Sequence, residues 1–336
     1  MQDEDRRFVL MGAGLLGLGV AGAVSAGSLN PPPGPVAPTG KPLTDIEPRI
    51  AVQSLAGDAT SVFLISQPGS YYLTGNITGV SGKDAVRITA SDVSLDLCGF
   101  GIAGPGNSGI NQAVGTRARI LNGLVGSLSG NAINVGAASV VSDVVVRSVP
   151  GVGIAAGAQS RIERCSVQGA GIGIQLSSGG TVQGCRVDTS ATTGISVGPG
   201  SRVSHCDVNN TGTGVSATAS AATNSTVITD CYVANATVDG INVASSGSVV
   251  ERCAVSSCST GIRVFGTQSR VALNQVTLCP TGINLSASSG IALVVQNTVY
   301  GSSSTAISAP ASAQVGPVLS AGAIAAATSP WANFTS

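Results

Sequence analysis

The chain has 336 residues, of which only 10 % are charged, and its formal net charge is zero. A protein that binds nucleic acid needs a basic face for the phosphate backbone, so this composition argues against that class of partner. Aromatic residues make up 3 % of the chain and glycine contributes 46 residues, which argues against a conventional core of large side chains.

The first predicted elements are an export leader and a linker. Arg6 and Arg7 precede a glycine-diluted apolar run that ends in small residues at 24–26, which predicts a signal peptide over residues 1–26. The paired arginines favour the twin-arginine route, with general secretion and an uncleaved membrane anchor as alternatives. Residues 27–49 are rich in proline and are expected to be a linker. The sequence thus predicts an exported protein, either periplasmic, on the cell surface or extracellular, with no membrane span after cleavage.

Residues 50–84 are expected to form an N-terminal cap. Two strand-like segments, 63–65 and 71–73, flank a turn at 67–70 that contains Pro and Gly. The open end of a solenoid exposes unpaired backbone and therefore has to be covered. The alternative is that Tyr71 and Tyr72 form a platform on which a sugar stacks.

Residues 85–308 repeat one phrase every twenty-odd residues: a small residue, a β-branched anchor, a small polar residue and an aliphatic residue. The anchors are Val86, Ile110, Ile133, Ile154, Ile174, Ile195, Val215, Ile241, Ile262, Ile283 and Ile307. A period of this length indicates one structural unit stacked many times. A second phrase, nine residues before each anchor, supplies further strands, so about three short parallel strands are expected in each coil. The prediction is an all-β, single-stranded parallel β-helix of about eleven coils, with a C-terminal cap over residues 309–336.

These phrases resemble those of right-handed parallel β-helix repeat proteins of the pectate-lyase-like superfamily. The segments 91-SDVSLDLCGFGIAG and 66-SQPGSYYLTGNI are similar to the first coil and cap of exported bacterial members, many of them from planctomycetes. Those proteins usually read LDLNGF where this chain has Cys98. The resemblance covers about residues 60–336 and implies the right-handed form of the fold, which carries many unrelated activities.

One cysteine recurs in each of five coils, at Cys165, Cys185, Cys206, Cys231 and Cys253, and Asn274 and Asn297 continue this column. A position that accepts both Cys and Asn is expected to be an interior stacking position. Stacked neighbours would lie about 4.8 Å apart, which is long for a disulfide with a Cβ separation of about 3.8 Å. We therefore expect free thiols. The chain has no CxxC pair and a single histidine, His205, so no metal site and no cofactor are predicted.

The outward row of the anchor strands is where the superfamily usually carries its chemistry. Here the row reads Asn134, Ala155, Gln175, Ser196, Ser216, Asn242, Arg263, Asn284 and Ser308. A glycosidase needs two carboxylates, and a lyase needs acids around Ca²⁺ together with a base. The row contains no acid, which argues against an enzyme. Its longer polar side chains could instead bind sugar hydroxyls, so the predicted ligand-binding residues are Asn134, Gln175, Asn242, Arg263 and Asn284.

The remaining candidate for chemistry lies beside the cysteine column. The repeat places Arg186 beside Asp207, and Asp230 between His205 and Arg252. One hypothesis is a small acid–base site that uses His205 and Asp230, with Asp207 and Arg186 nearby. The favoured hypothesis is a series of exposed ion pairs between coils.

The sequence therefore predicts a non-catalytic, exported structural or glycan-binding protein. The expected partner is a glycan or another component of the cell envelope. Two alternatives stay open: a polysaccharide lyase or glycoside hydrolase with unconventional site residues, and an assembly module that associates end-on or side by side. The oligomeric state does not follow from the sequence.

Overall fold

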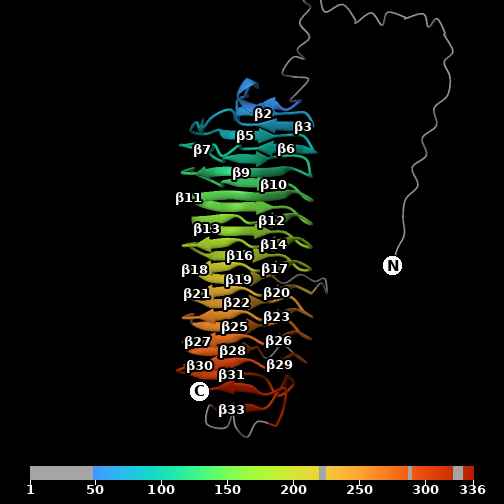
Figure 1. The fold of residues 1–336 in the computed structure, drawn as a ribbon, viewed down its shortest axis with the longest axis vertical. Helices are drawn as coiled ribbons and strands as arrows, with labels where there is room; N and C mark the ends of the chain where they lie inside the picture. The colour runs from blue at the N-terminus through green and yellow to red at the C-terminus, as the bar shows by residue number, and fades with distance from the viewer. Residues whose placement is uncertain (1–47, 219–224, 287–289, 321–327) are drawn as a thin grey trace, which may run out of the picture. The chain divides into compact units, whose positions relative to one another are not determined.

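A computed structural model describes residues 48–218, 225–286, 290–320 and 328–336. The predicted signal peptide, nearly all of the predicted linker, most of the long loop after residue 217 and part of the C-terminal tail lie outside the described residues. Within the described ranges, no helix is long and apolar enough to cross a membrane. Short strands follow one another in coils, each coil lying against the previous one (Figure 1).

The strands form three parallel sheets. The anchor sheet contains β2 (Ser61–Ile65), β5 (Asp84–Ile88), β8 (Ile110–Gln112), β10 (Ile133–Val135), the ends of β11 (Val140–Ala156) and β13 (Ser166–Leu176), β16 (Thr193–Val197), β19 (Thr213–Ala217), β22 (Asp239–Val243), β25 (Thr260–Val264), β28 (Thr281–Leu285) and β31 (Thr305–Ser308). The second sheet contains β3 (Gly69–Tyr72), β6 (Val93–Asp96), β9 (Arg119–Gly126), the start of β11, β12 (Arg161–Glu163), β14 (Thr181–Gln183), β17 (Arg202–Ser204), β20 (Val227–Thr229), β23 (Val249–Glu251), β26 (Arg270–Ala272), β29 (Leu293–Val295) and β32 (Gln314–Val315).

The third sheet contains β4 (Ile77–Thr78), β7 (Gly101–Ala103), parts of β9, β11 and β13, β15 (Arg186–Asp188), β18 (Asp207–Asn209), β21 (Tyr232–Ala234), β24 (Ala254–Ser256), β27 (Gln275–Thr277), β30 (Thr298–Tyr300) and β34 (Asn333–Thr335). Beyond the sheets lie β1 (Ile50–Ala51), which pairs with β3, the 3₁₀ helix η1 (Val52–Ser54), and β33 (Val318–Ser320), which pairs with β34. We call the junction between the second and third sheets the bend, and the junction between the third sheet and the next anchor strand the corner.

The register confirms the predicted repeat. Each of the eleven anchors is the register partner of the next one along the chain. Phe63 pairs with Val86 and adds one earlier coil, which gives a parallel β-helix of about twelve coils. The anchors from Val86 to Ile283 are completely buried, so one aliphatic stack runs along the interior.

The stacking begins inside the segment that was expected to be a cap. Strands β2, β3 and β4 pair in parallel with β5, β6 and β7, so they form a coil of the same kind. This coil lacks the glycine–isoleucine phrase, but Phe63 and Ile65 alternate toward the same interior as Val86 and Ile88. Tyr71 is 3 % exposed, and its hydroxyl donates to the carbonyl of Gln67 at 2.9 Å, so its ring is not an open platform for a sugar.

The glycine of the repeated phrase is required by close packing between coils. A Cβ atom added to Gly194 would lie 2.4 Å from Cγ1 of Val208 and 2.7 Å from the carbonyl oxygen of Gly214. The bend has a different requirement, because one residue in each coil takes a left-handed backbone conformation there. His205, Asp230 and Arg252 hold this position, with φ between 53° and 56°.

Candidate functional site

The charged residues at the bend form ion pairs between neighbouring coils. Arg252 binds both carboxylate oxygens of Asp230, from Nε to Oδ1 at 2.8 Å and from Nη2 to Oδ2 at 3.0 Å. Glu251 forms ion pairs with two arginines, Arg252 at 3.3 Å and Arg270 at 3.2 Å. The hydrogen bonds from Arg252 lower the pKa of Asp230 below its usual value. A carboxylate with a lowered pKa and two occupied oxygens is a poor general base.

The structure places the predicted acid–base residues side by side without joining them into a site. Arg186 and Asp207 are register partners, and their charged atoms lie 3.8 Å apart on an exposed surface. His205 borders a hollow of about 230 Å³ together with Arg164 and Gly184, one coil from Asp230. Both carboxylate oxygens of Asp230 are hydrogen-bonded to Arg252, and the charge interaction with His205 is the weakest of those that lower the pKa of Asp230. The arrangement therefore resembles a structural ion pair more than a proton relay.

Arginine–aspartate clamps of this kind predict a specific loss of stability in acid. The pKa values of Asp92, Asp143 and Asp230 are lowered by hydrogen bonds from arginines one coil further on, namely Arg117, Arg164 and Arg252. Because the pKa is lower in the folded state, these groups stabilise the fold above their unfolded pKa of about 3.9 and stop doing so as the pH falls through the folded value. The triple Asp→Asn variant should unfold at lower urea than the wild type at pH 6, and the gap should narrow as the pH falls below about 3.9. A gap that stays constant as the pH falls would contradict the role of the clamps.

The outward row of the anchor sheet is continuous, as its register shows from Asn134 to Ser308. Asn134 and Gln175 border a polar hollow of about 260 Å³. Asn242 and Arg263 instead bind Asp239. Its carboxylate accepts one hydrogen bond from Asn242 Nδ2 and one from Arg263 Nε, each at 2.8 Å. Of the five predicted ligand-binding residues, Asn134 and Gln175 border this hollow, although Asn134 Nδ2 already donates to Asn111 Oδ1 at 3.0 Å. Asn242 and Arg263 bind a carboxylate, and Asn284 follows Arg263 in the row and is half-buried.

Two buried carboxylates beside this row were missed by sequence reasoning. Asp239 is 3 % exposed and Asp84 is 6 % exposed. Asp84 accepts Asn111 Nδ2 at 2.8 Å and lies 3.6 Å from Arg87. Both acids precede a polar residue of the row by three positions, and this spacing was the available signal. Their strands β5 and β22 are separated by β8, β10, β11, β13, β16 and β19, which is roughly 34 Å at the usual strand spacing.

A groove with a volume of about 790 Å³ runs along the corners of five successive coils. We call it the corner groove. Its lining residues are Ser148, Val149, Pro150, Gly169, Ala170, Gly171, Thr189, Ser190, Ala191, Asn210, Thr211, Gly212, Asn235 and Thr237. Every one of them is uncharged. Small residues make the groove: at Gly171, for example, an added Cβ would lie 2.3 Å from the carbonyl oxygen of Pro150.

The corner groove is long and offers polar atoms along its rim. Five coils extend over roughly 20 Å at the usual spacing of parallel strands. The amide of Asn210 donates to Asp188 at 3.0 Å, and the amide of Asn235 donates to Asn209 at 2.9 Å. These bonds hold the two amides in place at the edge of an otherwise smooth, uncharged floor. Such a groove suits an extended, uncharged polymer with hydroxyl groups.

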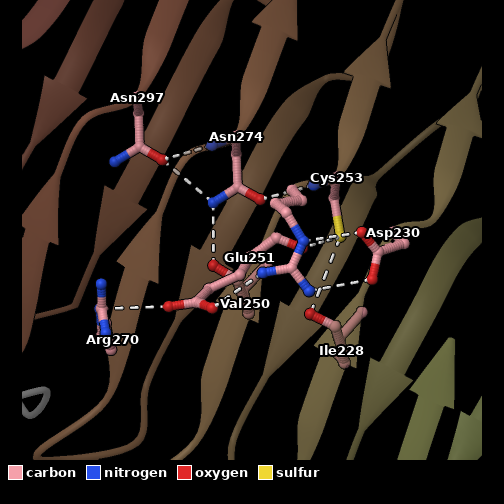
Figure 2. A network of polar contacts seen from close by, with 9 residues as sticks. Ile228, Asp230, Val250, Glu251, Cys253, Arg270, Asn274 and Asn297 are labelled. Atoms are coloured by element: carbon pink, nitrogen blue, oxygen red, sulfur yellow. Dashed lines mark hydrogen bonds and ion pairs between the residues drawn. The ribbon is translucent and has the colours of Figure 1, made fainter.

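The cysteines predicted to stack form a ladder of free thiols inside the bend. Its five members are at most 2 % exposed, and they are free in this structure, as are Cys98, Cys258 and Cys279. Cys253 Sγ lies 3.8 Å from the carbonyl oxygen of Ile228, and in the next coil Asn274 Nδ2 donates to the equivalent carbonyl of Val250 at 2.9 Å (Figure 2). Thiol and amide thus occupy one position and use the same carbonyls. The hydrogen bond with Cys231, together with burial, raises the pKa of Cys253 far above that of a free thiol.

Asparagines complete this ladder toward the C-terminal end. Asn274 Oδ1 accepts the backbone N–H of Cys253 at 2.9 Å, and Asn297 Oδ1 accepts that of Asn274 at 3.0 Å. Asn333 adds a further rung, which the sequence did not reveal, because its Oδ1 accepts the backbone N–H of Asn297 at 3.0 Å. The interior of the bend therefore offers no open site.

A comparison with models of known protein families found a match. The model of a family described as "Periplasmic copper-binding protein (NosD)" matches residues 126–315. The comparison with curated proteins found no match.

Solved structures are similar in fold at low sequence identity. The catalytic domain of a GH87 alpha-1,3-glucanase, solved in complex with tetrasaccharides, aligns with a TM-score of 0.51 and 12 % identity over 92 % of this chain and 70 % of that one. The Dettilon tailspike protein (gp208) aligns at 0.46 and 11 % over 82 % of this chain, which spans 60 % of the tailspike chain. The periplasmic alginate epimerase AlgG aligns at 0.46 and 12 % over 86 % of this chain and 83 % of its own. At this identity the likeness to the glucanase domain establishes the fold alone.

Proposed function

The chain belongs to the NosD family of periplasmic proteins, and from this premise we propose that it is a non-catalytic periplasmic protein that binds an extended, uncharged glycan. The observation that carries the proposal is the corner groove. Its volume of about 790 Å³ lies within the usual range for ligand pockets, and its lining combines apolar floor with hydroxyl and amide groups. Glycan recognition uses this combination, since sugars present hydroxyl groups along an otherwise apolar ring.

The absence of charge in the groove lining supports binding without chemistry. Glycoside hydrolysis uses two carboxyl groups about 5–9.5 Å apart. The groove lining contains no carboxylate. Asp84 and Asp239, the buried acids of the anchor sheet, are roughly 34 Å apart by the strand spacing and are each bound by an amide or a guanidinium group. Asp84 and Asp239 are therefore too far apart to act as the two carboxyl groups of a hydrolase.

The family description names copper, so we ask whether the described residues could bind a copper ion. Copper prefers thiolate, thioether and imidazole ligands. Among the described residues no group of three or more His, Cys, Asp or Glu could hold a metal ion. The ladder thiols are buried against backbone carbonyls, and His205 stands alone at the surface of the bend. The described residues do not fit a copper site, and the proposed function includes none.

Self-association is a second candidate, favoured by exposed apolar side chains on the last coils. Leu278 is 61 % exposed and Tyr300 is 58 % exposed, and the two lie on neighbouring coils, joined by a backbone hydrogen bond. Such a surface would suit the assembly module that the sequence analysis kept as an alternative.

Filling the corner groove tests the proposal. Ala191→Trp places an indole ring on the groove floor and should weaken the binding of neutral oligosaccharides at least tenfold, measured by isothermal titration calorimetry. Ala113→Trp is the matched control, because Ala113 is exposed but lies outside the groove lining. It should bind as the wild type does. Equal affinity of both variants, or no binding of any neutral glycan by the wild type, would exclude the groove as a glycan site.

A further inference from the structure

We infer that this chain completes its folding while its cysteines are reduced, and that it crosses into the periplasm already folded. The observation is that seven of its cysteines are buried in two stacks. Cys165, Cys185, Cys206, Cys231 and Cys253 form the thiol ladder, and Cys258 and Cys279 form a second stack at the corner. All seven are at most 2 % exposed.

The coil spacing disfavours disulfides within both stacks. Parallel strands hold stacked residues about 4.8 Å apart, whereas the Cβ atoms of a disulfide lie about 3.8 Å apart. Cysteines two coils apart are separated by about twice the strand spacing, which no disulfide spans. The thiols also have structural contacts to lose, since Cys253 Sγ lies 3.4 Å from the carbonyl of Glu251 and Cys279 Sγ accepts the backbone N–H of Cys258 at 3.4 Å.

The unfolded chain, in contrast, exposes every thiol. The periplasm holds protein disulfides that oxidise exposed thiols. Each such reaction joins two Sγ atoms of this chain, releases two protons and passes two electrons to the oxidant, whose disulfide becomes a dithiol. The folded chain escapes because buried thiols are unreactive. The order of events therefore decides the outcome: folding first gives the β-helix, and oxidation first gives cross-linked chains that cannot stack their coils.

A chain with this requirement needs a translocase that accepts folded proteins. The predicted leader contains the adjacent arginines Arg6 and Arg7, and paired arginines are the signal of the twin-arginine route. The predicted leader and the thiol stacks are independent of each other, and both favour the twin-arginine route. This inference uses the periplasmic location but not the glycan, so a failure of glycan binding leaves it standing.

The test compares leaders on the full-length chain in a bacterial host with an oxidising periplasm. One form keeps its own leader and the other carries a leader of the general secretory route, which transports unfolded chains. Periplasmic protein is denatured, its free thiols are mass-tagged with a maleimide, and its folded fraction is measured by protease resistance. We expect eight tags per chain with the native leader, and fewer tags with at least a fivefold loss of resistant protein with the secretory leader. A secretory-leader chain that arrives resistant with eight tags would overturn the inference.

Two controls keep the result specific. In a host that lacks the periplasmic thiol oxidant, the secretory leader should deliver as much resistant protein as the native one; a loss that persists there would overturn the role of oxidation. A variant with the five ladder cysteines changed to Asn and with Cys258→Ser and Cys279→Ser uses residues that the chain itself places in these stacks, such as Asn274 and Ser302. It should become indifferent to the leader. Arg6→Lys with Arg7→Lys should abolish export by the native leader, and undiminished export would exclude the twin-arginine route.

Discussion

Replacing Asn274 by alanine is expected to lower the free energy of unfolding by about 4 kcal/mol, because it leaves buried polar groups on two coils without partners. Asn274 is 2 % exposed. Its Nδ2 donates to Val250 and to Asn297 Oδ1 at 2.9 and 3.0 Å, and its Oδ1 accepts the backbone N–H of Cys253 at 2.9 Å. Each buried group that loses its only partner costs about 1–3 kcal/mol, and the cavity adds to that cost. Chemical denaturation followed by circular dichroism measures the change.

The chain supplies its own control for this substitution. Asn274→Cys extends the thiol ladder by one rung, and the thiol can use the carbonyl of Val250 as Cys253 uses that of Ile228. The thiol is a weaker donor and acceptor than the amide, so a smaller loss of about 1–2 kcal/mol is expected. If the cysteine variant were as unstable as the alanine variant, thiol and amide would not be equivalent rungs.

Gly194→Ala is expected to destabilise the fold by about 3 kcal/mol. At positions with enough space, the same substitution usually increases the stability of a protein. The new Cβ would lie 2.4 Å from Cγ1 of Val208 and 2.7 Å from the backbone oxygen of Gly214. A backbone atom cannot move aside without opening the pairing of β16 with β19. Thermal unfolding should show a lower midpoint than the wild type.

Gly75→Ala is the matched control for the glycine of the repeat. Gly75 has no atom within 4 Å of an added Cβ, and its φ lies outside the left-handed region. The alanine should therefore be neutral or stabilise the protein by about 0.5 kcal/mol through the unfolded chain. If Gly194→Ala were equally harmless, close packing would not be the reason for glycine in the repeated phrase.

The fold could be predicted because the residues that repeat in the sequence are the residues whose side chains stack in the interior. Each anchor from Val86 to Ile307 pairs in register with the next anchor, so residues that are one period apart in the sequence lie on adjacent coils of the solenoid. The coil of β2–β4 escaped prediction because Phe63 fills the anchor position without a glycine before it. Asn333 escaped for a related reason: the chain reaches its rung only after a long excursion through the tail.

The site was less predictable because it depends on how coils meet. The outward row was identified residue by residue, but Asp239 was not, since its carboxylate reaches the row from three residues earlier to bind Arg263. The corner groove had no sequence signal of its own. It results from small residues such as Ala170 and Gly212 that lie at the corners of successive coils, and no single coil contains it.

The central claim is that the corner groove binds an uncharged glycan and leaves it intact. The most direct measurement is to incubate the protein with a neutral oligosaccharide labelled at its reducing end and to follow bound and free sugar by mass spectrometry. We predict that the wild type retains the intact oligosaccharide, that Ala191→Trp retains at least tenfold less, and that no shorter product forms with either. Accumulation of cleaved or unsaturated sugar, or equal retention by the two proteins, would contradict the account.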